Sequence, residues 1–368
     1  MKLLVQPEDG AAPLIKGIEK ARTSVQLAIF RLDNKKVERA LRAAVSRVVA
    51  VRALIASKNR GGEEKLRQLE MRLLEYGVTV ARTDNDKSRY HDKYMIVDGR
   101  ELHLMAFNLT HLDMDRSRSF GVVTESRKLV QEAIELFEAD STRQPFAPKR
   151  GGLVISPLNA RKRLADFIRK SRKQLLIFDP KISDGSMIRL LQERAKAGVE
   201  IKIIGKLSVN DKALAVSKLP KLRLHTRTIL RDGRDAIVGS QSLRKSELDA
   251  RRELGIIVHE RKVIERLSKT FQEDWASAEL AKSVEKHKSE TARSAAEIVS
   301  DAVIGQIPAL APVMESALQQ VAKVKVNGSL DRKEVEATVQ SAVKRAVGNA
   351  VEEIVKDLVE EAHAAGEK

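Results

Sequence analysis

The chain has 368 residues, of which 42% are hydrophobic, so it can bury a sizeable core, and its formal net charge is +17. It contains no cysteine, which excludes a disulfide framework and a thiolate metal site, and no run approaches the roughly 18 apolar residues of a membrane span. Charge and proline follow the first residues too soon for a signal peptide, so we expect a cytoplasmic protein, either free or peripheral to a membrane. The excess charge lies in residues 1–280, which carry +19, whereas residues 281–368 carry −2; such a basic body attracts polyanions.

Strand and helix patterns alternate along the first 280 residues. The elements expected in the first half are strands at 24–30, 48–56 and 78–82 and helices at 35–47 and 62–77. The second half repeats this order, with strands at 174–178 and 199–205 and a helix at 185–198. Alternation of this kind predicts an α/β fold.

Two repeats and a C-terminal region account for the whole chain. The prolines and glycines of 141–152 are typical of a linker. We therefore place a first repeat at 1–145, a second at 146–282 and a helical region at 283–368. A duplicated domain fits better than a solenoid, whose period would be about 20–50 residues.

The C-terminal region has helical composition, interrupted by Pro308 and Pro312. Its last helix is expected to follow a stop and N-cap at 327–329 and has valine at every fourth position from Val335 to Val359. A wide apolar stripe needs a cover, which the main body, a second copy or another partner could supply. The C-terminal helices are thus candidates for self-association or partner binding.

One pattern occurs twice, 134 residues apart, at 90–108 and at 224–242. The matched residues are His91 and His225, Lys93 and Arg227, and Asp98-Gly99 and Asp232-Gly233. The match continues at the same offset, where 118–121 corresponds to 252–255. In-register duplication is what raises these two histidines above the background of incidental ones.

The repeated pattern predicts a phosphate site. Side chains two apart in a strand share a face, so each histidine and its following cation should point the same way. Asp-Gly predicts a two-residue hairpin turn, which would pair His91 with Ala106 and His225 with Ser240 and bring Asn108 and Ser242 close. A cation with an amide or hydroxyl donor suits a phosphoryl group. Asp98 and Asp232 could instead be turn residues or structural ion-pair partners.

The pattern His-x-Lys-x4-Asp followed by Gly-Ser-x-Asn resembles the HKD signature of the phospholipase D superfamily. The resemblance covers about residues 1–280 and leaves the C-terminal region aside. The first copy keeps His91, Lys93, Asp98 and Asn108 but has Met105-Ala106 for Gly-Ser. The second copy keeps His225, Asp232, Gly239 and Ser240, with Arg227 for lysine and Ser242 for asparagine. Glu253 matches the family's downstream glutamate, which orients a catalytic histidine, and Ser119 stands there in the first copy.

The resemblance implies two tandem phospholipase D-like α/β sandwich repeats about a pseudo-twofold axis, with one active site at their junction and the C-terminal helices as an extension. It implies that one histidine attacks phosphorus, forming a phosphohistidine, while the other protonates the leaving alcohol. We assign His91 as nucleophile and His225 as acid/base, with Lys93, Asp98, Asp232 and Glu253 as further catalytic groups. The expected phosphate-binding residues are Lys93, Asn108, Arg227, Ser240 and Ser242. No metal and no other cofactor is expected.

Three functions remain open at this stage. The first is hydrolysis or phosphatidyl transfer on phospholipid head groups, in which the basic face adsorbs to an anionic membrane. The second is a metal-independent nuclease or DNA-end-processing enzyme, which the basic body also suits. The third is a degenerate phosphate-binding scaffold, since arginine does not replace lysine neutrally in a tight phosphate site.

Overall fold

The computed structural model describes residues 1–57, 62–83, 89–148 and 151–306. The chain divides into two compact units, Met1–Glu279 and Leu280–Lys368. Helix α9 (Arg261–Gln306) is continuous through the predicted boundary at 282/283. The expected C-terminal valine helix lies outside the described residues. No helix within the described ranges has the length and apolar character to cross a membrane.

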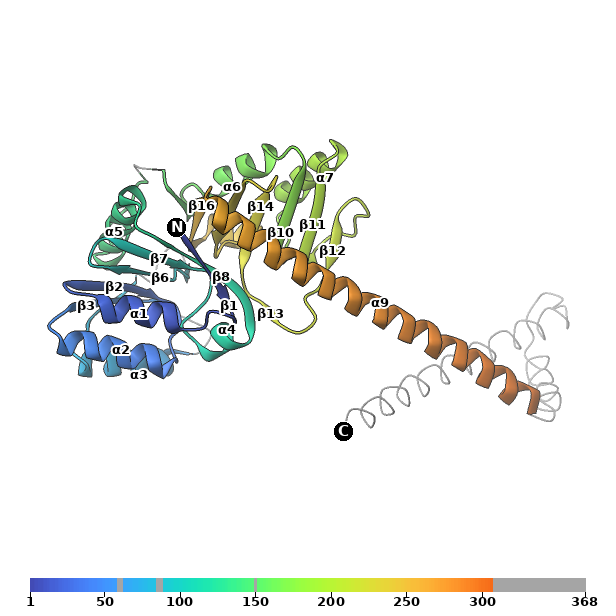
Figure 1. The fold of residues 1–368 in the computed structure, drawn as a ribbon, viewed down its shortest axis with the longest axis horizontal. Helices are drawn as coiled ribbons and strands as arrows, with labels where there is room; N and C mark the ends of the chain where they lie inside the picture. The colour runs from blue at the N-terminus through green and yellow to red at the C-terminus, as the bar shows by residue number, and fades with distance from the viewer. Residues whose placement is uncertain (58–61, 84–88, 149–150, 307–368) are drawn as a thin grey trace, which may run out of the picture. The chain divides into compact units, whose positions relative to one another are not determined.

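The first repeat is a mixed sheet with helices on both faces (Figure 1). Its strands, in spatial order, are β1 (Lys2–Gln6), β8 (Ser117–Thr124), β7 (Glu101–Met105), β6 (Tyr94–Val97), β2 (Ser24–Ile29), β3 (Ala50–Ile55) and β4 (Thr79–Arg82). Its helices are α1 (Ala12–Lys20), α2 (Lys35–Ser46), α3 (Glu63–Glu75), α4 (His111–Asp115) and α5 (Arg127–Ser141). Strands β2, β3 and β4 pair in parallel, and α2 and α3 supply the crossovers that parallel pairing requires.

The second repeat has the same strand order. Its strands are β9 (Leu153–Ser156), β16 (Arg251–Val258), β15 (Asp235–Gly239), β14 (Arg227–Arg231), β10 (Gln174–Ile182), β11 (Glu200–Leu207) and β12 (Ala215–Ser217). Its helices are α6 (Ala160–Arg169), α7 (Gly185–Lys196), α8 (Lys245–Asp249) and the start of α9. The expected strands and helices of both halves are therefore confirmed, within a few residues at their ends.

Matching caps begin the matching helices α2 and α7. The Asn34 side chain accepts hydrogen bonds from the backbone N–H of Lys36 and Val37, and Asp184 does the same for Ser186 and Met187. Each cap satisfies N–H groups that would otherwise lack a partner, which stabilises a helix by about 1 kcal/mol.

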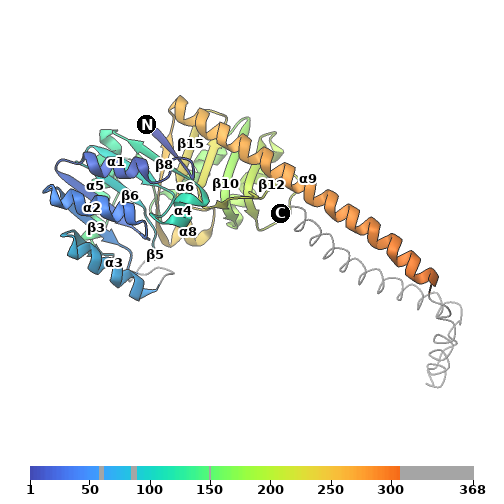
Figure 2. The same cartoon turned by 60° about the horizontal axis from the view of Figure 1, so that its bottom comes forward.

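Three apolar clusters define the layers. One joins the first sheet to α1, α2 and α3, and another joins the second sheet to α6 and α7. The third lies centrally and contains residues of both sheets together with α5 and the first turns of α9, including Phe137 and Phe271. Figure 2 shows α1 and α2 beside the first sheet and the first turns of α9 beside the second. The central cluster makes the two repeats one folded body.

Each repeat sends a short strand to the sheet of the other. Strand β5 (Arg89–Tyr90) pairs with β16, and β13 (Arg223–Leu224) pairs with β8. The two exchanges are equivalent under the duplication. They fix the segments immediately before His91 and His225 at the junction of the repeats.

The expected hairpin register is wrong by one residue in both repeats. The Asp-Gly turns form, with Asp98, Gly99, Asp232 and Gly233 all at positive φ. Strand pairing nevertheless joins Val97 to Glu101 and Arg231 to Asp235, leaving three residues in each loop. A shift of one residue moves side chains to the other face of a strand. Ala106 and Ser240 are therefore not the partners of the two histidines.

Candidate active site

The two repeated histidines line a single cavity of about 660 Å³. Basic side chains dominate its walls: Arg31, Lys65, Arg89, Arg223, Arg227, Arg244 and Arg251. Three carboxylates, Asp33, Asp113 and Glu247, also line it. The cavity therefore suits an anionic ligand that reaches both imidazoles.

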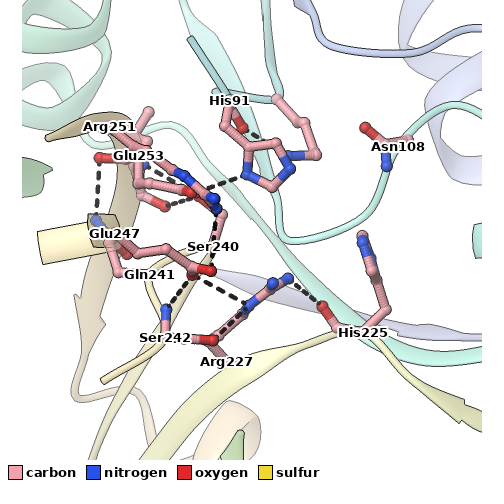
Figure 3. A network of polar contacts seen from close by, with 12 residues as sticks. His91, Asn108, His225, Arg227, Ser240, Gln241, Ser242, Glu247, Arg251 and Glu253 are labelled. Atoms are coloured by element: carbon pink, nitrogen blue, oxygen red, sulfur yellow. Dashed lines mark hydrogen bonds and ion pairs between the residues drawn. The ribbon is translucent and has the colours of Figure 1, made fainter. Parts of the chain in front are cut away.

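His91 is held on three sides. Its backbone N–H donates to the carbonyl of Arg252 at 2.9 Å, and its Nδ1 lies 2.8 Å from Glu253 Oε2. The ring meets Phe30 edge-on, with centroids 4.4 Å apart. Figure 3 shows Glu253 reaching His91 from the second repeat. A carboxylate at Nδ1 fixes the proton there and leaves Nε2 as the reactive nitrogen.

His225 has the equivalent backbone anchor but a looser side-chain partner. Its N–H donates to the carbonyl of Arg118 at 3.0 Å. Its Nδ1 lies 3.4 Å from Asp113 Oδ2, an ion-pair distance rather than a normal hydrogen bond. The two imidazoles are thus supported unequally.

Two arginines, one buried and one half-buried, link these anchors to the opposite repeat. Arg118 donates to Asp274 on α9 at 2.7 and 3.0 Å. Arg252 donates to Asp140 on α5 at 3.1 Å. Because the carbonyls of the same two arginines hold the histidines, the ion pairs tie the site's backbone to the packing between the repeats.

Lys93 and Arg227 occupy equivalent positions and make equivalent contacts. Lys93 Nζ donates to the carbonyl of His91 at 2.5 Å, and Arg227 Nη1 donates to that of His225 at 2.8 Å. Burial lowers the pKa of the Lys93 ammonium to about 8. Arginine thus reproduces the lysine's contact with the histidine backbone.

Both imidazoles favour the neutral form in the ligand-free cavity. Burial is the main cause that lowers the pKa of His91 and of His225 well below 6.5, and the neighbouring cations, Arg227 and Lys93 among them, act in the same direction. Burial also raises the pKa of Glu253. An anionic ligand would oppose the effect of the cations and favour protonation of an imidazole.

Some of the expected phosphate-binding side chains line the cavity, and others lie outside its lining. Asn108 lines the cavity, and its amide donates to Asp113 at 2.6 Å. Ser242 is buried and accepts a hydrogen bond from Arg227 Nε at 3.1 Å. Ser240 is also buried and bonds to the backbone of Leu254. Neither serine is among the residues that line the cavity, and Ser240 supports the strand.

Asp98 and Asp232 are not brought to the cavity. Asp98 accepts hydrogen bonds from the backbone N–H of Arg22, Thr23 and Ser24. Asp232 accepts the equivalent bonds at the start of β10. Burial acts to raise the pKa of both carboxyls, but the hydrogen bonds together outweigh it and lower the pKa. We therefore assign both residues the structural role that the sequence left open, in place of a catalytic one.

Sequence reasoning missed Asp113, Glu247 and every arginine of the cavity wall except Arg227. Asp113 and Glu247 are buried and equivalent at the 134-residue offset. Each accepts a backbone N–H, from Asn108 and from Ser242 respectively, at 2.8 Å. The shared offset and acidic character were the signal that could have found this pair.

The family model described as the PLD-like domain of cardiolipin synthase matches residues 14–141 and 164–275. One match falls in each repeat, and together they cover more than half of the chain. The chain therefore belongs to the phospholipase D superfamily, whose members are phosphodiesterases and phosphatidyltransferases.

Known proteins similar to the chain include an enzyme of lipid chemistry and two solved structures. A mitochondrial cardiolipin hydrolase of Danio rerio is 28% identical over 137 residues, which are 34% of this chain and 56% of that protein. Polyphosphate kinase from Porphyromonas gingivalis superposes with a TM-score of 0.62 and 18% identity, over 74% of this chain and 49% of the kinase. Phosphatidylserine synthase from Haemophilus influenzae gives 0.57 and 9%, over 75% and 86%. The chain thus spans about half the length of the first two proteins, and the two structures support the fold alone.

Proposed function

We propose that the protein is a phosphodiesterase acting on phospholipid head groups, by hydrolysis or phosphatidyl transfer, through a phosphohistidine. The observation that carries this proposal is the single basic cavity that both repeated histidines line, with Glu253 at Nδ1 of His91. Two imidazoles can divide nucleophilic and acid/base work in one site.

In the first step, the Nε2 lone pair of His91 attacks phosphorus. The bond from phosphorus to the leaving alcohol oxygen breaks, and protonated His225 gives that oxygen its Nε2 proton. Glu253 accepts the Nδ1–H of His91 and stabilises the positive charge that develops on the ring. Arg227 and the amide of Asn108 stabilise the phosphoryl oxygens.

In the second step, neutral His225 removes a proton from water or an acceptor alcohol. The resulting oxygen attacks phosphorus, and the bond from phosphorus to Nε2 of His91 breaks. His91 returns to its starting state and His225 is again protonated, so every proton is accounted for. Water gives hydrolysis and an alcohol gives transfer.

A lipid substrate is supported by two features outside the chemistry. The matching family is described from cardiolipin synthase, and the relative found is a cardiolipin hydrolase. The cavity wall also contains apolar side chains, including Leu66, Leu69 and Leu112, and Leu112 is 49% exposed. The arginines suit the anionic phosphate, and the leucines suit the first methylenes of an acyl chain.

The test is release of head group from vesicles that mix anionic and zwitterionic phospholipids, without metal and with chelator. The expected result is turnover that His91→Ala abolishes and that His259→Ala, a 69% exposed histidine side chain on the surface, leaves unchanged. Phosphorus NMR of enzyme quenched in alkali during turnover should show a phosphohistidine. Absence of lipid turnover by the wild-type protein would refute the proposal.

A nuclease is the second candidate, because the six arginines of the cavity wall would equally suit a nucleic acid backbone. Its binding would weaken steeply as salt rises, whereas lipid turnover would follow vesicle composition. A plasmid and a single-stranded oligonucleotide run beside the vesicles, with the same two variants, distinguish these functions. Binding without turnover that is insensitive to His91→Ala and His225→Ala would indicate the phosphate-binding scaffold.

A further inference from the structure

The duplication predicts a carboxylate beside each histidine, but one is missing. Glu253 is fully buried and contacts Nδ1 of His91. The residue equivalent to Glu253 in the first repeat is Ser119. Its side chain is also buried, and its Oγ has no hydrogen-bond partner within the described part of the chain. His225 therefore lacks the partner that His91 has.

Another carboxylate of the first repeat reaches His225. Asp113, on the short helix α4, places Oδ2 3.4 Å from Nδ1 of His225 and is only 2% exposed. The equivalent residue of the second repeat, Glu247, accepts from Arg251 and from the backbone of Ser242. Ser119 offers no carboxylate to Nδ1 of His225. Asp113 instead lies within ion-pair distance of that nitrogen.

We propose that Asp113 is the positioning residue of His225 and replaces the glutamate absent at position 119. This inference rests on the proposed phosphodiester chemistry, in which His225 is the acid and base. A carboxylate at Nδ1 keeps a proton on that nitrogen in both charge states, so Nε2 always faces the substrate. When His225 takes up a second proton, attraction should shorten the contact to a charge-assisted hydrogen bond of about 2.7–2.9 Å.

The same carboxylate also holds a proposed phosphate-binding group. Asp113 Oδ2 accepts from the backbone N–H of Asn108 at 2.8 Å and from its side-chain amide at 2.6 Å. Asp113 Oδ1 pairs with the guanidinium of Arg223, two residues before His225. Asp113 therefore couples the position of the acid to the position of the amide that receives the phosphoryl oxygen.

Several charged groups determine the protonation of His225, so the test must isolate Asp113. Arg223 and Arg227 face the imidazole from its own repeat, and Lys93 and His91 face it from the other. All four oppose its protonation. Asp113 is the negative charge in contact with the ring, so its removal should lower the pKa of His225, whereas a merely structural change should leave that pKa in place.

The experiment compares Asp113→Asn, Ser119→Glu and the double variant by proton and nitrogen NMR of His225, whose signal His225→Ala identifies. In Asp113→Asn the pKa of His225 should fall by about one unit or more, since an opposite charge at this range shifts a pKa by about 1–3 units. kcat/KM should fall by about 10–100-fold, the range known for partners that orient metal-bound histidines. The double variant should regain most of both losses, because glutamate at 119 restores the arrangement around His91.

An unchanged pKa of His225 in Asp113→Asn would overturn the proposal, and so would a loss of activity that Ser119→Glu does not relieve. If Asp113→Asn does not fold, the tautomer of His225 in the wild-type protein, measured by nitrogen NMR, tests the contact. Neutral His225 should be the Nδ1–H tautomer, and an Nε2–H tautomer would refute the contact. The NMR measurements need no substrate, so a failure to find lipid turnover would remove the proposed function and leave this test intact.

Discussion

Replacement of Glu253 by glutamine is the most direct test of the proposed nucleophile. The substitution keeps the shape of the side chain but removes its charge. Glu253 is fully buried and its Oε2 lies 2.8 Å from Nδ1 of His91. A buried hydrogen bond to a charged group is worth about 1.5–3 kcal/mol, and about 1.4 kcal/mol corresponds to a tenfold change in rate. We therefore expect kcat for head-group release to fall by roughly 10–150-fold.

The loss should appear in formation of the phosphohistidine, because the charge on His91 develops in that step. Rapid-quench measurement of the first turnover would detect it as a slower release of the leaving alcohol. Ser119→Ala is the matched control, since it alters the equivalent residue, whose hydroxyl has no hydrogen-bond partner among the described residues. If Glu253→Gln and Ser119→Ala both keep wild-type kcat, Glu253 does not assist His91 and the reasoning fails.

Three further predictions concern the framework, the pH dependence and the second motif. Arg118→Met should lower the free energy of unfolding by about 3–5 kcal/mol, because it leaves a carboxylate of α9 buried without its partner; thermal unfolding measures this, and an unchanged Tm would contradict it. kcat/KM should fall as pH rises through the pKa of His225, which lies well below 6.5, and fall again near pH 8 as Lys93 loses its proton; a pH–rate profile that is flat from pH 6 to 9 would contradict both assignments. Arg227→Lys and Ser242→Asn should each lower kcat/KM about tenfold, the usual effect of one lost hydrogen bond to a charged group. The double variant should recover most of the wild-type kcat/KM. Strictly additive losses would show that the two positions are independent.

The sequence predicted what depends on local pattern and on duplication. The strand and helix periodicities identified the elements that form the sheets, and the 134-residue offset singled out His91 and His225. The family resemblance added Glu253 and implied that these residues share one site. Duplication is informative because two copies of one fold hold matching residues at matching positions, so a residue that recurs at the offset has a position shared by both repeats. The same logic indicated that Ser119 was a departure, although the sequence alone did not show what compensates for it.

The sequence could not predict contacts that cross between the repeats or depend on a one-residue shift. Asp113 meets His225 because β13 pairs with β8 of the other repeat, and no local pattern encodes that pairing. The extra residue in each Asp-Gly loop changes the register, and a register error moves every later side chain to the other face. Ser240 was for this reason expected beside His225, whereas it supports the strand behind it.

The departures from the family motif in the second repeat are related through one contact. Arg227 repeats the bond of Lys93 to its histidine carbonyl, and its additional Nε donates to Ser242 at 3.1 Å. A lysine has no donor at that point of the side chain, and a serine has the small acceptor that the larger guanidinium needs. The exchange of lysine for arginine and the exchange of asparagine for serine are therefore coupled, because the smaller serine side chain leaves room for the larger guanidinium and accepts its hydrogen bond.

The departures in the first repeat concern the cavity wall. Met105 and Ala106 are buried, and neither lines the cavity. Met105 pairs with Gly121, whereas the equivalent Gly239 pairs with Gly255. In the second repeat the Gln241 side chain lies over this glycine pair, because a Cβ at Gly239 would meet its Oε1 at 2.5 Å. In the first repeat the equivalent residue Phe107 lies over Gly121, because a Cβ at Gly121 would meet its ring at 3.2 Å. The exchange therefore alters the packing of buried residues and leaves the groups that line the cavity in place.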